Sequence, residues 1–422
     1  MERSQEDGPQ ETKGGVFIKR MDRRRLLKTA GLAGAALGVG SAFGGLAGAT
    51  AETAEARRTT APDVSGDCVA VLGLGAGPAL YGDKNNTGFA LFHNGSAYLI
   101  DSGAGTPKAF AALGVTLDKV KGVFFTHHHV DHTAGYADLL SRGFWQLAGT
   151  LSVWGPSLPK VGGVDALKAL TDGIMAAFDP GYELDFWVRP YLGIPPSVPA
   201  PRPDVAIHPI VSADPAAITV IPILTDDPDM RVEAIEVDHD EDFGTCYAYR
   251  FTLLDKGTPT GKVVVFSGDR AHYNARRDFS DSSPYYAEGG QGHGKGPYFP
   301  EHPTIAEFQE AFRSFAAGAT LLVHEASKKA SATLIASPES PDADLKAFYW
   351  HLVDSHTDVG EIPVIAKDAN VGAVVLSHYG DYTWKRPEVT RRIILSGVLE
   401  ANAKVGYRGK IIAPMEMDVI RF

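Results

Sequence analysis

Short apolar runs recur along the chain, and several of them end directly in histidine or aspartate residues. Each run holds about four to eight residues bounded by glycine or polar positions, which is typical of a buried or half-buried strand. We therefore predict strands whose ends carry side chains suited to chemistry. These runs span residues 120–125, 232–237, 263–266 and 371–376.

Further strands and helices alternate around these runs. Strand-like segments lie at residues 68–74, 88–93, 97–101, 151–156, 245–254 and 321–326, and helix-like segments at 107–113 and 134–142. Such alternation predicts an α/β class of fold, with functional residues on loops at one edge of the sheets. From about residue 160 to 205 the alternation breaks into a helix-like segment and a proline-rich, aromatic stretch, which predicts an inserted lid or arm, or an oligomer contact.

The first of the apolar runs leads into the most informative segment, Thr126–His132. It holds four candidate metal ligands within six residues: His127, His129, Asp131 and His132. If the strand continues, His127 and His129 point the same way, because side chains two apart share a face of a strand. The turn that follows can carry Asp131 and His132 to a neighbouring point, so one segment can serve two metal ions. A solvated histidine-rich loop is the alternative.

The pattern His-x-His-x-Asp-His resembles the signature of the metallo-β-lactamase superfamily. Three later residues match the remaining ligands of that family in order, namely His239, Asp269 and His378, each at the end of an apolar run. The resemblance implies seven ligands for two ions: His127, His129 and His239 for one, Asp131, His132 and His378 for the other, and Asp269 as a bridge beside a shared hydroxide. A turn histidine at 239 and a helix cap at 269 are the alternatives.

Two further segments resemble ribonuclease Z-like proteins of that superfamily. The sequence HEA at 324–326 ends one strand, and the sequence SHT at 355–357 precedes the last ligand. By this resemblance His356 supplies the proton donor, with a structural histidine as the alternative. His324 and Glu325 orient His356 or touch the substrate.

The resemblance also covers residues 73–78 and 99–105, which are similar to the start of ribonuclease Z-like and arylsulfatase-like members. In that comparison Asp101 braces the metal loop by hydrogen bonds, and a turn-capping aspartate is an equal alternative. The implied fold is an αβ/βα four-layer sandwich of the α/β class, or α+β in some schemes. We expect it to occupy residues 64–422, with the lid or arm at about 160–205 as an insertion.

The ligand set predicts hydrolysis. Two divalent cations, expected to be Zn²⁺ with Fe or Mn as alternatives, lower the pKa of a shared water from about 15.7 toward neutrality and so supply a hydroxide nucleophile. Asp131 and His356 are the predicted catalytic residues. The expected substrate is a small ester, either an aryl sulfate or a phosphodiester. A ribonuclease Z-like enzyme acting on RNA and a metal-binding protein without catalysis are the alternatives.

The amino-terminal segment has a composition of its own. Residues 23–28 (RRRLLK) precede an apolar stretch of small residues at 29–46, and further small residues follow at 47–51. This order resembles a twin-arginine export signal, which implies the twin-arginine machinery as a partner and a periplasmic or extracellular location. We assign residues 1–51 to a signal region and residues 52–63 to a linker. Retention as a membrane anchor is the alternative.

Charge and cysteine content limit the expected partners. The chain has 40 Lys and Arg against 51 Asp and Glu, a net charge of −11, and removing residues 1–49 takes away more basic than acidic side chains. An acidic protein does not favour nucleic-acid binding, and the arm contains few cations, so we expect a small-molecule substrate. Cys68 and Cys246 are expected to be separate buried thiols rather than one disulfide.

Overall fold

The structure is a computed structural model that describes residues 61–77, 82–143, 149–157, 165–185, 202–211, 217–239, 246–271, 305–334, 336–337, 339–342, 349, 352–380 and 386–422. The chain divides into two units, Met1–Thr50 and Ala51–Phe422, and every described residue belongs to the second. The predicted signal region, most of the predicted linker and much of the predicted arm lie outside the described residues. Those three assignments stay predictions.

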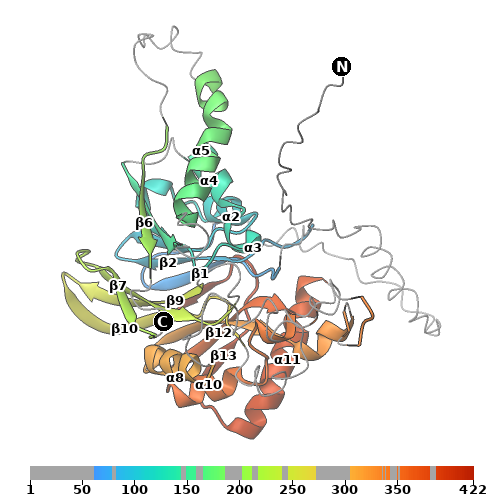
Figure 1. Ribbon diagram of the computed structural model, residues 1–422. Coiled ribbons are helices and arrows are strands. Elements are labelled where there is room, and N and C mark those ends of the chain that lie inside the picture. Colours follow the sequence, from blue (N-terminus) through green and yellow to red (C-terminus); the bar gives the residue numbers. More distant parts are fainter. Residues whose placement is uncertain are drawn as a thin grey trace, which may run out of the picture. The chain divides into compact units, whose positions relative to one another are not determined.

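Two sheets of seven strands form the frame of the described residues (Figure 1). The first contains β1 (Cys68–Gly73), β2 (Gly88–His93), β3 (Ser96–Ile100), β4 (Val120–Phe124), β5 (Leu151–Pro156), β6 (Val205–Ile210) and β14 (Val419–Arg421). The second contains β7 (Val220–Leu224), β8 (Met230–Val237), β9 (Cys246–Asp255), β10 (Thr258–Phe266), β11 (Leu321–Ser327), β12 (Ala373–Gly380) and β13 (Lys410–Ile412). Their orders are β14-β1-β2-β3-β4-β5-β6 and β13-β12-β11-β10-β9-β8-β7.

Helices cover the outer face of each sheet (Figure 1). The first sheet carries α2 (Thr106–Ala112), α3 (Val130–Thr133), α4 (Tyr136–Gly143) and α5 (Ala166–Asp185). The second carries α8 (Ile305–Ala316), α10 (Ile362–Asp368) and α11 (Pro387–Val405). Short 3₁₀ turns lie at η2 (Leu117–Lys119) and η5 (Lys329–Leu334). The layers run helix, sheet, sheet, helix, so the predicted fold class is confirmed.

The continuous apolar runs of the sequence follow from burial on both faces of a strand. In β1, Val69 and Val71 face the core between the sheets, whereas Cys68, Ala70 and Leu72 face the helices of the first sheet. Successive side chains of a strand point to opposite faces, so every position of β1 is buried although its neighbours differ. This is why a run such as β1 reads as uniformly apolar.

An aromatic cluster joins the two sheets just below the histidine run at 127–132. The ring of Phe124 on β4 stacks on Trp154 with centroids 4.7 Å apart and meets Phe251 of the second sheet edge-on at 5.2 Å. The hydroxyl of Tyr249 on β9 donates to the carbonyl of Phe125 at 2.6 Å. The end of β4, where the histidine run begins, is therefore fixed against the second sheet.

The strands expected from the apolar runs are present, with shifts of a few residues at their ends. The sequence patterns did not predict β6, β7, β13 and β14, nor helices α8, α10 and α11. Cys68 and Cys246 are both free and buried, which confirms separate thiols. The helix-like part of the arm is α5. No helix among the described residues combines the length and the apolar character needed to cross a membrane.

Candidate metal centre

The histidine run lies on a loop and a short helix rather than on a strand. Strand β4 ends at Phe124, and α3 begins at Val130. The condition under which His127 and His129 would share a strand face is therefore not met, because the strand stops before them. The loop nevertheless brings their rings together, with centroids 4.6 Å apart.

Asp101 braces this loop from the end of β3. Its Oδ1 accepts the backbone N–H of Thr126 at 2.8 Å, and its Oδ2 accepts the Nδ1–H of His132 at 2.8 Å. The hydroxyl of Thr126 lies 3.0 Å from Oδ2 as well. The contacts match the bracing interpretation and not a turn cap. With Nδ1 held by Asp101, the ring of His132 presents its Nε2 to Asp131 and Asp269.

A first set of histidines gathers where the two sheets meet. The imidazoles of His127, His129 and His239 bring ring nitrogens within 4.8 Å of one another. Nε2 of His239 lies 3.2 Å from Nδ1 of His129, and the opposite nitrogen of His239 donates to the carbonyl of Ser355 at 2.6 Å. His239 is buried and directed inward, in contrast to a surface turn histidine.

A second set lies beside the first and consists of Asp131, His132 and His378. Oδ2 of Asp131 is 3.1 Å from Nε2 of His378 and 3.6 Å from Nε2 of His132. The same oxygen accepts the backbone N–H of Gly77 at 2.6 Å, so the glycine-rich turn after β1 restrains this carboxylate.

His378 reaches the centre through a bulge inside β12, whereas the sequence placed it at the end of the strand. Glu325 on β11 pairs with Ser377, but the next residue, Ala326, pairs with Tyr379. His378 is thus the extra residue of the bulge, and its φ is 44°. A bulge of this kind redirects one side chain out of the normal alternation.

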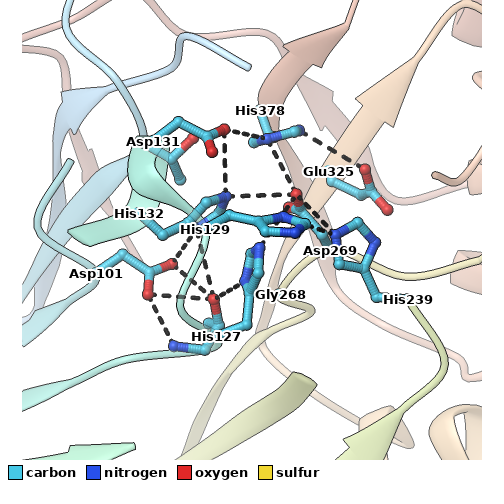
Figure 2. A network of polar contacts seen from close by, with 12 residues as sticks. Asp101, His127, His129, Asp131, His132, His239, Gly268, Asp269, Glu325 and His378 are labelled. Carbon is cyan, nitrogen blue, oxygen red and sulfur yellow. Dashed lines mark hydrogen bonds and ion pairs between the residues drawn. The ribbon is translucent and has the colours of Figure 1, made fainter. Parts of the chain in front are cut away.

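Asp269 lies at the meeting point of both sets (Figure 2). Its Oδ2 is within salt-bridge distance of ring nitrogens from five histidines: 3.0 Å from His378, 3.3 Å from His132, 3.8 Å from His356 and 3.9 Å from both His127 and His239. The carboxylate follows β10 and is nearly inaccessible to solvent. It occupies the position expected of a shared ligand, not of a helix cap.

The donor set fits divalent metal ions. The Nε2 atoms of His127 and His132 are buried and make no hydrogen bond within the described part of the chain, although buried polar atoms are otherwise almost always paired. Burial, together with the neighbouring His132 and His129, holds the pKa of His127 well below its usual range. A neutral imidazole offers its lone pair to a metal, and nitrogen and carboxylate oxygen donors suit zinc, iron or manganese.

Electrostatics keep the two buried aspartates ionised. Burial by itself raises the pKa of Asp269, but the adjacent His378 and His132 outweigh burial and hold the pKa well below its usual range. The pKa of Asp131 is lowered in the same way, since burial is outweighed by His132 and His378. Both carboxylates are therefore available as anionic ligands.

Glu325 and His356 form a pair at the side of the centre. Nδ1 of His356 donates to Oε2 of Glu325 at 2.8 Å. Oε1 of Glu325 accepts two backbone N–H groups, from Arg270 at 2.6 Å and from Thr357 at 3.1 Å. Burial lowers the pKa of His356, but Glu325 more than offsets this and raises it to about 9.

Residues 81–227 match the family described as the metallo-β-lactamase superfamily. This chain has a two-sheet α/β sandwich that is consistent with the fold of that superfamily, and the family match covers 147 of its 422 residues. It is 38% identical over 85 residues to ribonuclease Z of Methanopyrus kandleri, a match that covers 20% of this chain and 30% of that protein. It is 38% identical over 65 residues to the anti-Pycsar protein Apyc1 of Bacillus phage 010DV004, covering 15% of this chain and 25% of that protein. The chain thus spans less than a third of either relative.

Two solved structures are also similar. The short form of human tRNase Z is 16% identical with a TM-score of 0.48, and the match covers 84% of this chain and 98% of that one. YhfI of Bacillus subtilis is 16% identical with a TM-score of 0.46 over the same shares of the two chains.

Two neighbouring polar residues of β11, His324 and Glu325, lie on opposite faces of the strand. Glu325 joins the centre, but His324 is fully buried on the other side of the strand, against Phe312 with ring centroids 5.7 Å apart. Burial and the adjacent Arg270 lower the pKa of His324 to about 3. The expectation that His324 touches substrate is therefore not met. Alternation along β11 was the signal that could have separated these two residues.

Proposed function

We propose that this chain is a metal-dependent hydrolase of a small ester, with a phosphodiester or an aryl sulfate as the bond that is cleaved. One observation carries the proposal: Oδ2 of Asp269 lies 3.0–3.9 Å from ring nitrogens of four histidines that belong to two ligand sets. A single buried carboxylate oxygen at that position fits a ligand shared by two ions. The catalytic assignment rests in addition on the pair formed by Glu325 and His356.

Two divalent ions fit the sets described above, with Zn²⁺ expected and Fe or Mn as alternatives. One would be held by His127, His129 and His239, the other by Asp131, His132 and His378, with Asp269 common to both. When bound, such ions act as Lewis acids and lower the pKa of water toward neutrality. The protein supplies fixed donors, because Asp101, Gly77 and the carbonyl of Ser355 each restrain one ligand by a hydrogen bond.

His356 is proposed as the proton donor to the leaving group. Its Nδ1–H is held by Glu325, and its raised pKa keeps the ring protonated at neutral pH, so the other ring nitrogen carries a proton for donation. General acid catalysis of this kind contributes about two to four orders of magnitude when the leaving group is poor. We expect His356→Ala to slow phenyl esters by that amount and to leave activated nitrophenyl esters nearly unchanged.

Metal content and an ester panel test the proposal. Purified protein should contain about two equivalents of divalent metal and hydrolyse nitrophenyl phosphodiesters or nitrophenyl sulfates. Asp269→Ala should abolish turnover and lower the metal content, whereas Asp118→Ala, at an exposed position paired with Lys119, should do neither. Bound metal without turnover on any ester would favour the non-catalytic metal-binding alternative. Turnover that survives Asp269→Ala would refute the assignment of the centre.

RNA hydrolysis is the second candidate, favoured by the local match to ribonuclease Z of Methanopyrus kandleri. The negative charge of the chain argues for a small substrate instead. Cleavage of a transfer RNA precursor at rates above those of small phosphodiesters would reverse this ranking.

Export by the twin-arginine route and a periplasmic or extracellular location are proposed from residues 23–28 and the apolar stretch that follows. Replacing both Arg23 and Arg24 with lysine should retain the protein inside the cell, as measured by cell fractionation. Mature protein recovered with the stretch uncleaved, in the membrane fraction, would support the anchor alternative. Contact between copies through residues 160–205 is proposed as well, and light scattering of the purified protein tests it.

A further inference from the structure

The residue after Asp269 has a charged side chain buried in the protein interior. Arg270 is 2% exposed. Its guanidinium donates from Nη1 to Nε2 of His324 at 3.4 Å and from Nη2 to Oε1 of Gln309, and it stacks on the ring of Phe312 at 4.1 Å. Within the described part of the chain, no carboxylate accepts a hydrogen bond from it. Burial lowers the pKa of Arg270 to about 10 even though the charges of Glu361, Glu325 and Asp238 offset part of the cost, so its buried position calls for a reason.

The backbone of Arg270 makes hydrogen bonds to Glu325 and Thr357, the residues next to the proposed proton donor His356. Its N–H donates to Oε1 of Glu325 at 2.6 Å, and its carbonyl accepts the hydroxyl of Thr357 at 3.1 Å. The N–H of Thr357 donates to the same Oε1 at 3.1 Å. With Oε1 held by two N–H groups, Oε2 of Glu325 is the atom presented to His356.

The side chain of Arg270 ties this backbone to two neighbouring elements. His324 accepts from Arg270 at Nε2, so its proton is on Nδ1, which donates to the carbonyl of Glu325 at 2.7 Å. On α8, the amide of Gln309 accepts from the guanidinium and donates to the carbonyl of Ala271 at 3.1 Å. The planar fork of arginine can reach both partners and the aromatic face at once, which a lysine ammonium cannot.

We propose that Arg270 is a positioning residue for the proton donor. Its buried guanidinium fixes its own backbone N–H, that N–H fixes Glu325, and Glu325 fixes the ring of His356. The inference rests on the proposed function in so far as His356 acts as the acid. It predicts that Arg270 matters for the departure of a poor leaving group and not for the binding of metal.

Kinetics on two esters separate positioning from general stability. With metal-loaded protein, Arg270→Met should lower kcat on a phenyl ester by about 10- to 100-fold, the usual cost of losing a group that orients its neighbour. The KM for the phenyl ester and the turnover of the nitrophenyl ester should change little. Arg270→Lys should recover part of the loss. If Arg270→Met does not fold, Gln309→Leu removes the α8 anchor alone and should shift kcat in the same direction.

Arg250→Met is the matched control. Arg250 also ties the second sheet to α8, through Nη1 to the carbonyl of Phe315 at 2.6 Å, but it lies away from Glu325. This variant should lose thermal stability and keep the ratio of phenyl to nitrophenyl ester rates. Adding Arg270→Met to His356→Ala should produce no further loss on the phenyl ester, because the acid is already absent. The proposal would be overturned if Arg270→Met slowed both esters equally or if its effect added fully to that of His356→Ala. The same change of the ester rate ratio in Arg250→Met would also overturn it.

A measurement that needs no turnover keeps this inference separate from the proposed function. In histidine-labelled, zinc-loaded protein, the NMR signal of the Nδ1 proton of His356 should move or broaden in Arg270→Met and stay in place in Arg250→Met, with two zinc ions bound in each. If the protein hydrolyses no ester, the proposed function fails, and this signal alone decides about Arg270. An unchanged signal in Arg270→Met would refute the positioning role.

Discussion

Asp101→Asn tests how much the brace behind the ligands contributes to metal binding. The carboxylate accepts Thr126 N–H at one oxygen and His132 Nδ1–H at the other, each at 2.8 Å. An asparagine presents one oxygen and one NH₂ group at the same place, so one of these two donors must face another donor. Flipping the amide moves the conflict from one donor to the other and does not remove it.

The expected loss follows from the kind of hydrogen bond that is removed. A hydrogen bond to a charged group contributes about 1.5–3 kcal/mol, and about 1.4 kcal/mol corresponds to a tenfold change in an equilibrium constant. Metal affinity should therefore fall about 10- to 100-fold. The loss should be concentrated on the ion held by Asp131, His132 and His378, because His132 loses its fixed orientation while His239 keeps its bond to Ser355.

Competition with a chromophoric zinc chelator measures both sites. Wild-type protein and Asp101→Asn should differ at one of the two zinc ions and much less at the other. Asp418→Asn is the control, since Asp418 likewise accepts a backbone N–H, from Met415 at 2.8 Å, but belongs to a turn near β14. Equal affinities of wild type and Asp101→Asn at both sites would show that the brace is not needed to orient His132.

Three further variants test the surroundings of the centre. Gly103→Ala should lower the zinc content measured by mass spectrometry from two ions toward one, because the new Cβ would lie 2.2 Å from the carbonyl oxygen of Asp131. Glu416→Gln should raise the free energy of unfolding at pH 8 by about 1–3 kcal/mol and change it little at pH 4.5. Burial raises the pKa of Glu416 to about 7. The contribution of Glu416 to stability is therefore full below the unfolded pKa of 4.5 and is lost as the pH rises toward 7. Phe124→Ala should cost about 3–5 kcal/mol in urea unfolding, since the ring packs against both sheets.

Each of these variants has a result that would contradict the reasoning. Full zinc occupancy in Gly103→Ala would mean that α3 shifts without disturbing its ligands, and Gly173→Ala, where the added Cβ has open space, should be harmless. A stability gain for Glu416→Gln that is equal at both pH values would exclude a titration. A loss below about 1 kcal/mol for Phe124→Ala would show that the aromatic cluster does not hold the sheets together.

The ligands of the centre could be predicted from sequence because each follows an apolar run, and strand ends on one edge of a sheet come together. The route by which three of them arrive was not predictable. His378 depends on a bulge in β12, which is set by pairing with β11 and leaves no mark in the local sequence. His127 and His129 depend on a loop whose start is fixed by Tyr249, a residue far along the chain.

The short edge strands and the outer helices escaped prediction for a different reason. Strands β13 and β14 contain three residues each, too few to show a period. Helix α11 buries only part of one face, so polar residues interrupt the helical period of its apolar positions. The role of Arg270 was also invisible, because an arginine after a loop aspartate ordinarily suggests a solvated position and not a buried one.

Both ligand sets draw on both sheets. His127 and His129 follow β4 of the first sheet and His239 follows β8 of the second, while Asp131 and His132 lie on α3 beside the first sheet and His378 on β12 of the second. Metal binding is therefore coupled to the packing of one sheet against the other. The packed ring of Phe124 and the bond from Tyr249 to Phe125 hold the two sheets together just below the ligands. Because these contacts already join the sheets, the binding energy of a metal need not be spent on bringing them together.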